Sequence, residues 1–257
     1  MGVKIIEFIK TPFKICILER IRFLILFSFW KSCIIDNGDD EMKNILFDLD
    51  GTLTDPFLGI THSVAYSLKS FGIEVHDLET LKPFIGPPLD VSFQEYYHMD
   101  EKRSWEAVEK YREYFSTKGL FENKVYDGME EFLQSLSDKK LYVCTSKPEV
   151  FARKILDHFS LTPYFTEIYG ASLDGKLKNK GDIIAHCLKQ EHLNNQDCIM
   201  VGDRQHDIVG AHQNHIPCIG VLYGYGNLEE FQQYHCDYIV EDLKELKEII
   251  EEWENVK

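Results

Sequence analysis

Three aspartates stand close together at the end of an apolar run near residue 45. The segment "ILFDLDGTLTD" (45–55) carries Asp48, Asp50 and Asp55. Burying an unpaired charge costs free energy, so a buried strand has no structural reason to end in several carboxylates. A carboxylate can attack an electrophile as a nucleophile, and a second one beside it can donate and accept a proton. The segment therefore predicts a reactive site at the end of a strand.

Other polar groups follow apolar runs further along the chain. Thr145 and Ser146 end one run, Asp203 ends another with Asp207 one helical turn further on, and Lys180 precedes a helical segment. Ligands of open parallel sheets bind beyond the carboxyl ends of the strands, where we expect these groups to meet. Two carboxylates about 4 Å apart repel by roughly 4 kcal/mol at an effective dielectric constant of about 20. A cluster of oxygen ligands with this charge predicts a Mg²⁺ site.

The residue types at this edge favour phosphoryl chemistry. Asp48 can attack a phosphoryl group and form an aspartyl phosphate, which water then hydrolyses. Asp50 can protonate the leaving oxygen and later activate the water. A glycine lets the backbone pass close to a phosphate, while hydroxyls and an ammonium can hold its oxygens. The phosphate ligands that we expect on these grounds are Gly51, Thr145, Ser146 and Lys180.

The sequence leaves the roles of several neighbouring residues open. Lys147 and Arg204 can add positive potential near the phosphate or can pair with neighbouring acids. The glycine-rich segment 220–226 contains Tyr223 and Tyr225, to which the sequence assigns no role. Asp55 lies past the turn, at the start of a linker, and we do not expect it to be catalytic.

The elements that must position these groups alternate between strands and helices. Apolar runs on both faces are typical of parallel strands covered by helices, and they predict strands at 44–48, 141–145, 167–171, 198–202, 217–222 and 237–240. Helical periodicity follows at 128–140, 148–159 and 180–192, with Asp127 expected to cap the first helix and Pro148 to lie in the first turn of the second. The fold class predicted is α/β, a doubly wound parallel sheet of the Rossmann-like kind.

One section interrupts this alternation. Residues 56–126 contain no convincing strand, whereas 59–72 and 100–119 carry helical periodicity. We therefore expect a smaller, all-helical domain at 57–126, inserted after the first strand. The core domain would then consist of 42–56 and 127–257, joined to the insertion by linkers at 54–57 and 120–127.

The first 41 residues differ from the rest. Basic residues precede an apolar run from Phe23 to Trp30, which is far shorter than the roughly 20 residues that a membrane-spanning helix needs. We interpret 1–41 as an N-terminal extension or as the product of a start assigned too far upstream of Met42, with a signal or anchor as the alternative.

Composition limits the class of partner. The net charge of -15 disfavours nucleic acid and anionic membrane surfaces, unless the N-terminal segment is an anchor. Seven widely spaced cysteines without a C-x-x-C pair indicate reduced thiols, so we expect a cytoplasmic protein. The oligomeric state cannot be predicted from the sequence.

Four motifs resemble those of the haloacid dehalogenase superfamily of phosphohydrolases. They are "FDLDGTLTD", "CTSKP", "NKGDII" and "MVGDRQHDIVGA", in the order typical of the superfamily, and the resemblance extends over about residues 43–250. It implies a nucleophile at Asp48, an acid and base at Asp50, and phosphate ligands at Thr145 and Lys180. It also implies Mg²⁺ held by Asp48, the backbone carbonyl of Asp50 and Asp203, with Asp207 supporting these ligands from behind.

The helical insertion resembles the cap of the phosphoglycolate phosphatase and 5′-nucleotidase-like branch. The segment "FIGPPL" (84–89), with Gly86 and Pro87, is similar to a cap loop that closes over substrate. This resemblance implies a phosphatase acting on small phosphorylated metabolites, such as phosphoglycolate or nucleoside 5′-monophosphates.

Other activities within and beyond the superfamily compete with this one. A sugar phosphomutase of the β-phosphoglucomutase type shares all four motifs, and a binding module can keep the fold without turnover. A dehalogenase is disfavoured because it needs no second aspartate at Asp50, and a P-type ATPase has threonine there. A phosphonatase would need a cap lysine, for which Lys69 is the weak candidate.

Overall fold

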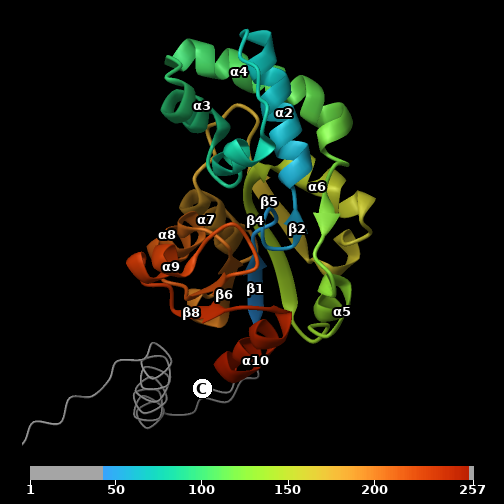
Figure 1. Ribbon diagram of the computed structural model, residues 1–257. Coiled ribbons are helices and arrows are strands. Elements are labelled where there is room, and N and C mark those ends of the chain that lie inside the picture. Colours follow the sequence, from blue (N-terminus) through green and yellow to red (C-terminus); the bar gives the residue numbers. More distant parts are fainter. Residues whose placement is uncertain (1–42, 255–257) are drawn as a thin grey trace, which may run out of the picture. The chain divides into compact units, whose positions relative to one another are not determined.

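A parallel sheet of six strands forms the centre of the protein (Figure 1). The structure is a computed structural model that describes residues 43–254. The strands lie in the order β5-β4-β1-β6-β7-β8, which places β1 between β4 and β6. Their bounds are β1 Asn44–Phe47, β4 Lys140–Pro148, β5 Glu167–Ala171, β6 Cys198–Gly202, β7 Cys218–Val221 and β8 Tyr238–Val240. All six strands that the sequence predicts are present, so the predicted fold class is confirmed.

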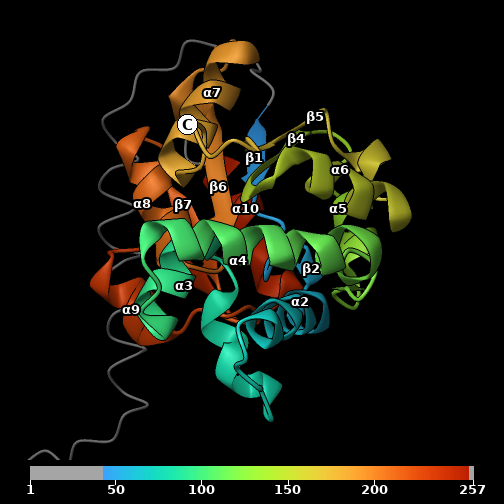
Figure 2. The ribbon, with the colours of Figure 1, turned by 90° about the horizontal axis from the view of Figure 1, so that it is seen from above.

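Helices cover both faces of this sheet, as Figure 2 shows from above. Alternate residues of β1 point to opposite faces of the sheet. Leu46 belongs to the apolar cluster under α7 (Lys180–Gln190) and α8 (Gln205–Gln213), while Phe47 packs edge-on against Phe132 of α5 (Met129–Gln134). This division explains why the strand sequences are apolar at every position. The core helices are α5 Met129–Gln134, α6 Glu149–His158, α7 Lys180–Gln190, α8 Gln205–Gln213, α9 Leu228–Gln233 and α10 Leu243–Glu254, with short 3₁₀ turns at Thr162–Tyr164 and Asn195–Asp197.

Two helix starts differ from the prediction. Asp127 does not cap α5, because Gly128 occupies the cap position with a positive φ of 81° and Asp127 is exposed, paired with Lys124 at 3.2 Å. Pro148 does not lie in the first turn of α6 but closes β4 and precedes the first helical residue. Both errors concern local backbone geometry, which the apolar pattern does not specify.

The inserted segment is helical and gathers at one end of the sheet (Figure 1). Its two long helices, α2 (Phe57–Ser70) and α4 (Glu101–Tyr114), pack against each other, and the hydroxyl of Ser67 donates a hydrogen bond of 2.7 Å from α2 to the carbonyl of Ala107 in α4. The sequence predicted these two helices but missed the shorter elements between them. The bounds are α2 Phe57–Ser70, a 3₁₀ helix η1 Leu78–Phe84, α3 Leu89–Tyr97, α4 Glu101–Tyr114 and a π turn η2 Phe115–Gly119.

The two connections to the insertion form an antiparallel ribbon that the sequence did not predict. β2, Thr54–Asp55, pairs with β3, Lys124–Val125. Strands of two residues are too short to show an alternating pattern, which is why sequence reasoning described both segments as linkers. The ribbon brings the entry and exit of the insertion side by side.

The N-terminal segment 1–41, and every prediction made for it, lies outside the residues that the structure describes. Within 43–254, no helix has both the length and the apolar character required to cross a membrane.

We expect the packing of α2 to be measurable through two leucines of that helix. Leu68 is fully buried, whereas Leu58 is 51% exposed. Leu68→Ala removes buried methyl groups and leaves a cavity, so it should lower the free energy of unfolding by ~2–5 kcal/mol. Leu58→Ala should change it by less than about 0.5 kcal/mol. Urea unfolding followed by circular dichroism measures both, and equal effects would contradict this packing of α2.

Candidate active site

The polar groups that the sequence singled out meet at the carboxyl ends of β1, β4 and β6. Asp48 directly follows β1, and its backbone N–H donates a hydrogen bond of 2.9 Å to the carbonyl of Val201 in β6. Thr145 lies in β4 on one side, and Asp203 follows β6 on the other. All three side chains are at least 90% buried. The strand order therefore creates the cluster, because β1 has these two strands as neighbours.

Lys180 joins two of the carboxylates. Its Nζ lies 2.8 Å from Asp48 Oδ1 and 2.8 Å from Asp207 Oδ1, and it donates a third bond of 2.9 Å to the carbonyl of Cys144. Burial alone would lower the pKa of the ammonium, but the carboxylates of Asp207 and Asp48 outweigh burial and raise its pKa above the usual range. Lys180 is therefore a permanent positive charge, placed at the first residue of α7.

Three carboxylates form a group that fits a divalent cation. Asp48, Asp203 and Asp207 each place one oxygen within 4.8 Å of the others. Asp203 accepts a bond of 2.8 Å from the N–H of Tyr225 on Oδ2, while its buried Oδ1 has no hydrogen-bond partner among the described residues. Burial, with the charges of Asp207 and Asp48, raises the pKa of Asp203 well above its ordinary value. An unsatisfied buried oxygen among repelling acids is the environment that a bound cation relieves.

Asp207 is held from both sides. Its Oδ2 accepts the backbone N–H of Arg204 at 3.0 Å at the start of α8, and its Oδ1 faces Lys180. Burial raises the pKa of Asp207 to about 6, although Lys180 opposes the shift. Because Oδ2 accepts a hydrogen bond from Arg204 and Oδ1 is paired with Lys180, Asp207 is suited to holding the ammonium of Lys180 in position.

Lys147 resolves one alternative that the sequence left open, since it pairs with an acid. Its Nζ lies 2.5 Å from Asp50 Oδ2 and 4.7 Å from the centroid of the Phe115 ring in η2. Burial raises the pKa of Asp50, and the nearby ammonium of Lys147 only partly offsets this shift. Lys147 thus connects the expected acid and base to the helical insertion.

The expected phosphate ligands surround the same point. Gly51 has a positive φ of 85°, and a Cβ there would lie 2.1 Å from Asp203 Oδ2, so the turn requires glycine. The hydroxyl of Thr145 accepts the N–H of Lys147 at 3.2 Å, and Ser146 lines the adjoining pocket.

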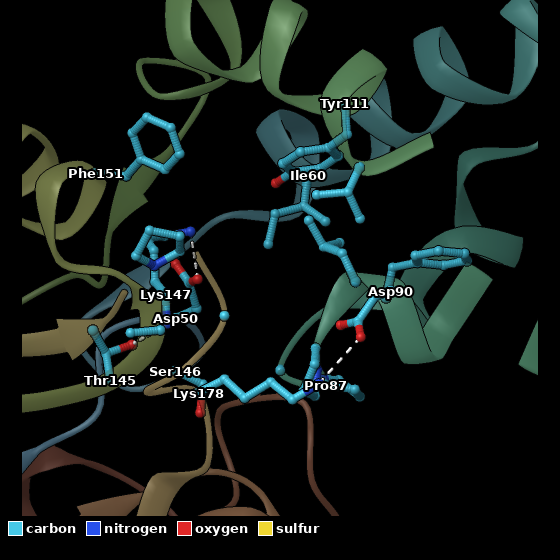
Figure 3. Close-up of a pocket in the computed structure, with 18 of the residues that line it drawn as sticks. Asp50, Ile60, Pro87, Asp90, Tyr111, Thr145, Ser146, Lys147, Phe151 and Lys178 are labelled. Atoms are coloured by element: carbon cyan, nitrogen blue, oxygen red, sulfur yellow. Dashed lines mark hydrogen bonds and ion pairs between the residues drawn. The ribbon is translucent and has the colours of Figure 1, made fainter. Parts of the chain in front are cut away.

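A pocket separates these groups from the helical insertion (Figure 3). Asp48, Asp50 and Thr145 line it from the sheet, and the insertion contributes both of the predicted loop residues, Gly86 and Pro87. Most of the remaining wall from the insertion is apolar or aromatic: Ile60, Phe84, Leu89, Trp105, Val108, Tyr111 and Phe115.

The segment after β7 contributes contacts that the sequence did not predict. The N–H of Tyr225 donates a hydrogen bond to Asp203, and the hydroxyl of Tyr225 donates one to Asp55 in the ribbon. Tyr223 donates a bond of 3.1 Å to the carbonyl of Thr52. The position of this segment at the carboxyl end of a predicted strand was the signal that could have revealed it.

Comparison with known proteins identifies the family. Residues 45–221 match the model of the family described as haloacid dehalogenase-like hydrolase. The chain belongs to this hydrolase family. The resemblance inferred from the four motifs is thereby confirmed.

Relatives of this hydrolase carry several names. A Pseudomonas aeruginosa protein named 5′-nucleotidase is 49% identical over 210 residues, which are 81% of this chain and 95% of the relative. Tyrosine-protein kinase PtkA of Mycobacterium tuberculosis is 37% identical over 72% of this chain and 64% of its own length. A phosphoglycolate phosphatase from Colwellia psychrerythraea is 26% identical over 80% of this chain and 96% of its own. The crystal structure of a predicted phosphatase from Clostridium acetobutylicum aligns with a TM-score of 0.80 at 51% identity, covering 82% of this chain and 99% of that one.

The acid cluster predicts how magnesium should affect stability. The raised pKa values of Asp203 and Asp207, the latter about 6, mean that folding favours their protonated forms. Without metal, this contribution to stability is present at acidic pH and is lost as the pH rises through about 6. Since Mg²⁺ competes with protons for the carboxylates, it should raise the melting temperature more at about pH 7.5 than at about pH 5.

Thermal unfolding with Mg²⁺ or with a chelator measures this effect. Asp203→Asn should abolish most of the magnesium-dependent rise, whereas Asp138→Asn, at a side chain that is 72% exposed, should retain it. An undiminished rise in Asp203→Asn would show that the cation binds elsewhere.

Proposed function

We propose that this hydrolase is a Mg²⁺-dependent phosphatase that cleaves small phosphomonoesters through an aspartyl phosphate at Asp48. The observation that carries the proposal is the contact of Lys180 with Asp48, 2.8 Å long and buried beside Asp203. It places a permanent positive charge next to a carboxylate that must approach a phosphate dianion. Without such a charge, the repulsion between nucleophile and substrate would prevent close approach.

The first step uses residues whose contacts already favour it. Asp48 Oδ1 is occupied by Lys180 and by the N–H of Leu49 at 2.7 Å, so Oδ2 is the oxygen for attack on phosphorus. Asp50 is suited to protonating the leaving oxygen, because its raised pKa increases the fraction that carries a proton. Thr145 and Lys180 would stabilise the charge on the transferring phosphoryl oxygens.

The second step releases phosphate. Asp50, now ionised, would take a proton from water as the water attacks the phosphorus of the aspartyl phosphate, which regenerates Asp48. Lys147 favours the ionised form of Asp50 at this stage and so helps the same carboxyl serve in both steps. Water must enter between the steps, so the helical insertion should open and close on the β2–β3 ribbon.

The residues that would hold the cation are Asp48, Asp203 and the backbone carbonyl of Asp50, with Asp207 fixing Lys180 from behind. Mg²⁺ bound there would supply charge neutralisation for the phosphoryl group.

Nucleoside 5′-monophosphates are the leading substrates, ahead of phosphoglycolate. Two features support this order: the apolar and aromatic lining contributed by the insertion, and the 49% identity to a protein named 5′-nucleotidase against 26% for a phosphoglycolate phosphatase. The alternative that remains is a sugar phosphomutase, which would require a bisphosphate activator. We propose that the protein acts in the cytoplasm.

Replacing the nucleophile tests the proposal. Asp48→Asn keeps the size of the side chain but removes the charge that attacks phosphorus, so steady-state release of phosphate should fall by at least ~10³-fold. The matched control is Asp127→Asn, because that side chain is 91% exposed and lies outside the pocket. Phosphate release from p-nitrophenyl phosphate and nucleoside monophosphates measures both variants.

Each outcome of this assay has a distinct meaning. Activity retained by Asp48→Asn would overturn the mechanism. Absence of hydrolysis by the unaltered protein with Mg²⁺ would favour a binding module instead.

A further inference from the structure

An ion pair forms part of the pocket wall away from the expected nucleophile. Asp90 lies in the first turn of α3, and its Oδ2 is 3.2 Å from Nζ of Lys178, in the loop between β5 and α7. Asp90 is 91% buried, and both residues line the pocket. Asp90 could not be selected from the sequence, and Lys178 lacked a feature that distinguished it from other loop lysines.

Asp90 lies across the pocket from the phosphate-binding groups, and the side chain of Lys178 extends to it from the side on which Ser146 lies. Figure 3 shows Asp90 on the side opposite Asp50 and Thr145, with Tyr111 and Ile60 along the wall that connects the two sides. The pocket thus has three parts: a site for a phosphate, an apolar middle and a second polar end. Phosphoglycolate offers the apolar middle only one methylene group to contact. A nucleoside 5′-monophosphate presents a phosphate, a sugar and a flat ring with a polar edge.

Both members of the pair retain bonding capacity. A carboxylate can accept about four hydrogen bonds, and an ammonium can donate three. Within residues 43–254, the one side-chain hydrogen bond or ion pair that the structure gives for each of them is the bond to the other. They therefore offer an acceptor and a donor side by side at the surface of the pocket.

We propose that Asp90 and Lys178 recognise the edge of a nucleobase. Asp90 accepts a hydrogen bond from a ring or exocyclic N–H, Lys178 donates one to the adjacent carbonyl oxygen or ring nitrogen, and the apolar wall contacts the ring. On its Watson–Crick edge, every nucleobase presents a donor beside an acceptor, which matches the ion pair. This inference rests on the proposed phosphatase function and adds the residues that select a nucleotide among small phosphomonoesters.

The same ion pair also joins the insertion to the sheet domain. The competing explanation is therefore a closing contact, which we define as an ion pair that only holds the insertion in place over the pocket and does not touch the substrate. A closing contact would affect every substrate alike, whereas recognition of the base affects only substrates that carry one. The informative quantity is therefore the ratio of kcat/KM for a nucleoside 5′-monophosphate to kcat/KM for ribose 5-phosphate, which has no base.

Asp90→Asn keeps an oxygen acceptor but removes its charge, so we expect it to lower this ratio by about 10-fold, because hydrogen bonds to a charged group are roughly twice as strong as those between neutral groups. Lys178→Met should lower it similarly. The double variant Asp90→Lys with Lys178→Asp restores an ion pair across the boundary but exchanges donor and acceptor. For the nucleotide that the unaltered enzyme prefers, the ratio should stay low in this double variant.

Two results would overturn the inference. One is an unchanged ratio in Asp90→Asn, whether both substrates lose activity equally or neither does. The other is full recovery of the ratio in the double variant, which would identify a closing contact. Failure of the proposed function is distinguishable, because the unaltered enzyme would then hydrolyse neither ribose 5-phosphate nor the nucleotide.

Discussion

The structure depends on holding four carboxylates together in a buried site. Asp48, Asp50, Asp203 and Asp207 are all at least 90% buried, and two lysines, Lys147 and Lys180, pair with three of them. Full ionisation would leave an excess of two negative charges, which the protein can tolerate only through raised pKa values or a bound cation. The raised pKa values of Asp50, Asp203 and Asp207 show that burial and charge repulsion disfavour the ionised forms of these three groups. A divalent cation would neutralise the excess, and a phosphate could then approach.

The rest of the fold serves this arrangement. Parallel strands bring their carboxyl ends to one edge, and the central position of β1 gives Asp48 neighbours in β4 and β6. Lys180 can reach two carboxylates because it begins α7, which packs on β4, β5 and α8. The insertion contributes the pocket wall and, through Phe115, a contact with the ammonium that pairs with Asp50. In the proposed mechanism, Lys147 thus links the position of the insertion to the protonation state of Asp50.

Much of this could be predicted from the sequence, for identifiable physical reasons. Strands covered on both faces must be apolar throughout, so β1, β4 and β6 were recognisable, and the groups that follow them had to meet at one edge. Partners that depend on side-chain direction were not predictable: Lys147 could have faced the phosphate or an acid, and only the structure shows its contact with Asp50. The β2–β3 ribbon was missed because two-residue strands carry no period. Asp90 was missed because its partner, Lys178, is 88 residues away in the sequence.

The central claim is that Asp48 is the nucleophile of a site completed by a cation. A crystal structure of the protein with Mg²⁺ and beryllofluoride, a mimic of the phosphoryl group on aspartate, tests it most directly. The account predicts beryllium bonded to a carboxylate oxygen of Asp48, fluorine atoms contacted by Thr145 and Lys180, and Mg²⁺ bound by Asp48 and Asp203. Beryllofluoride on another carboxylate, or Mg²⁺ bound away from Asp203, would contradict the account.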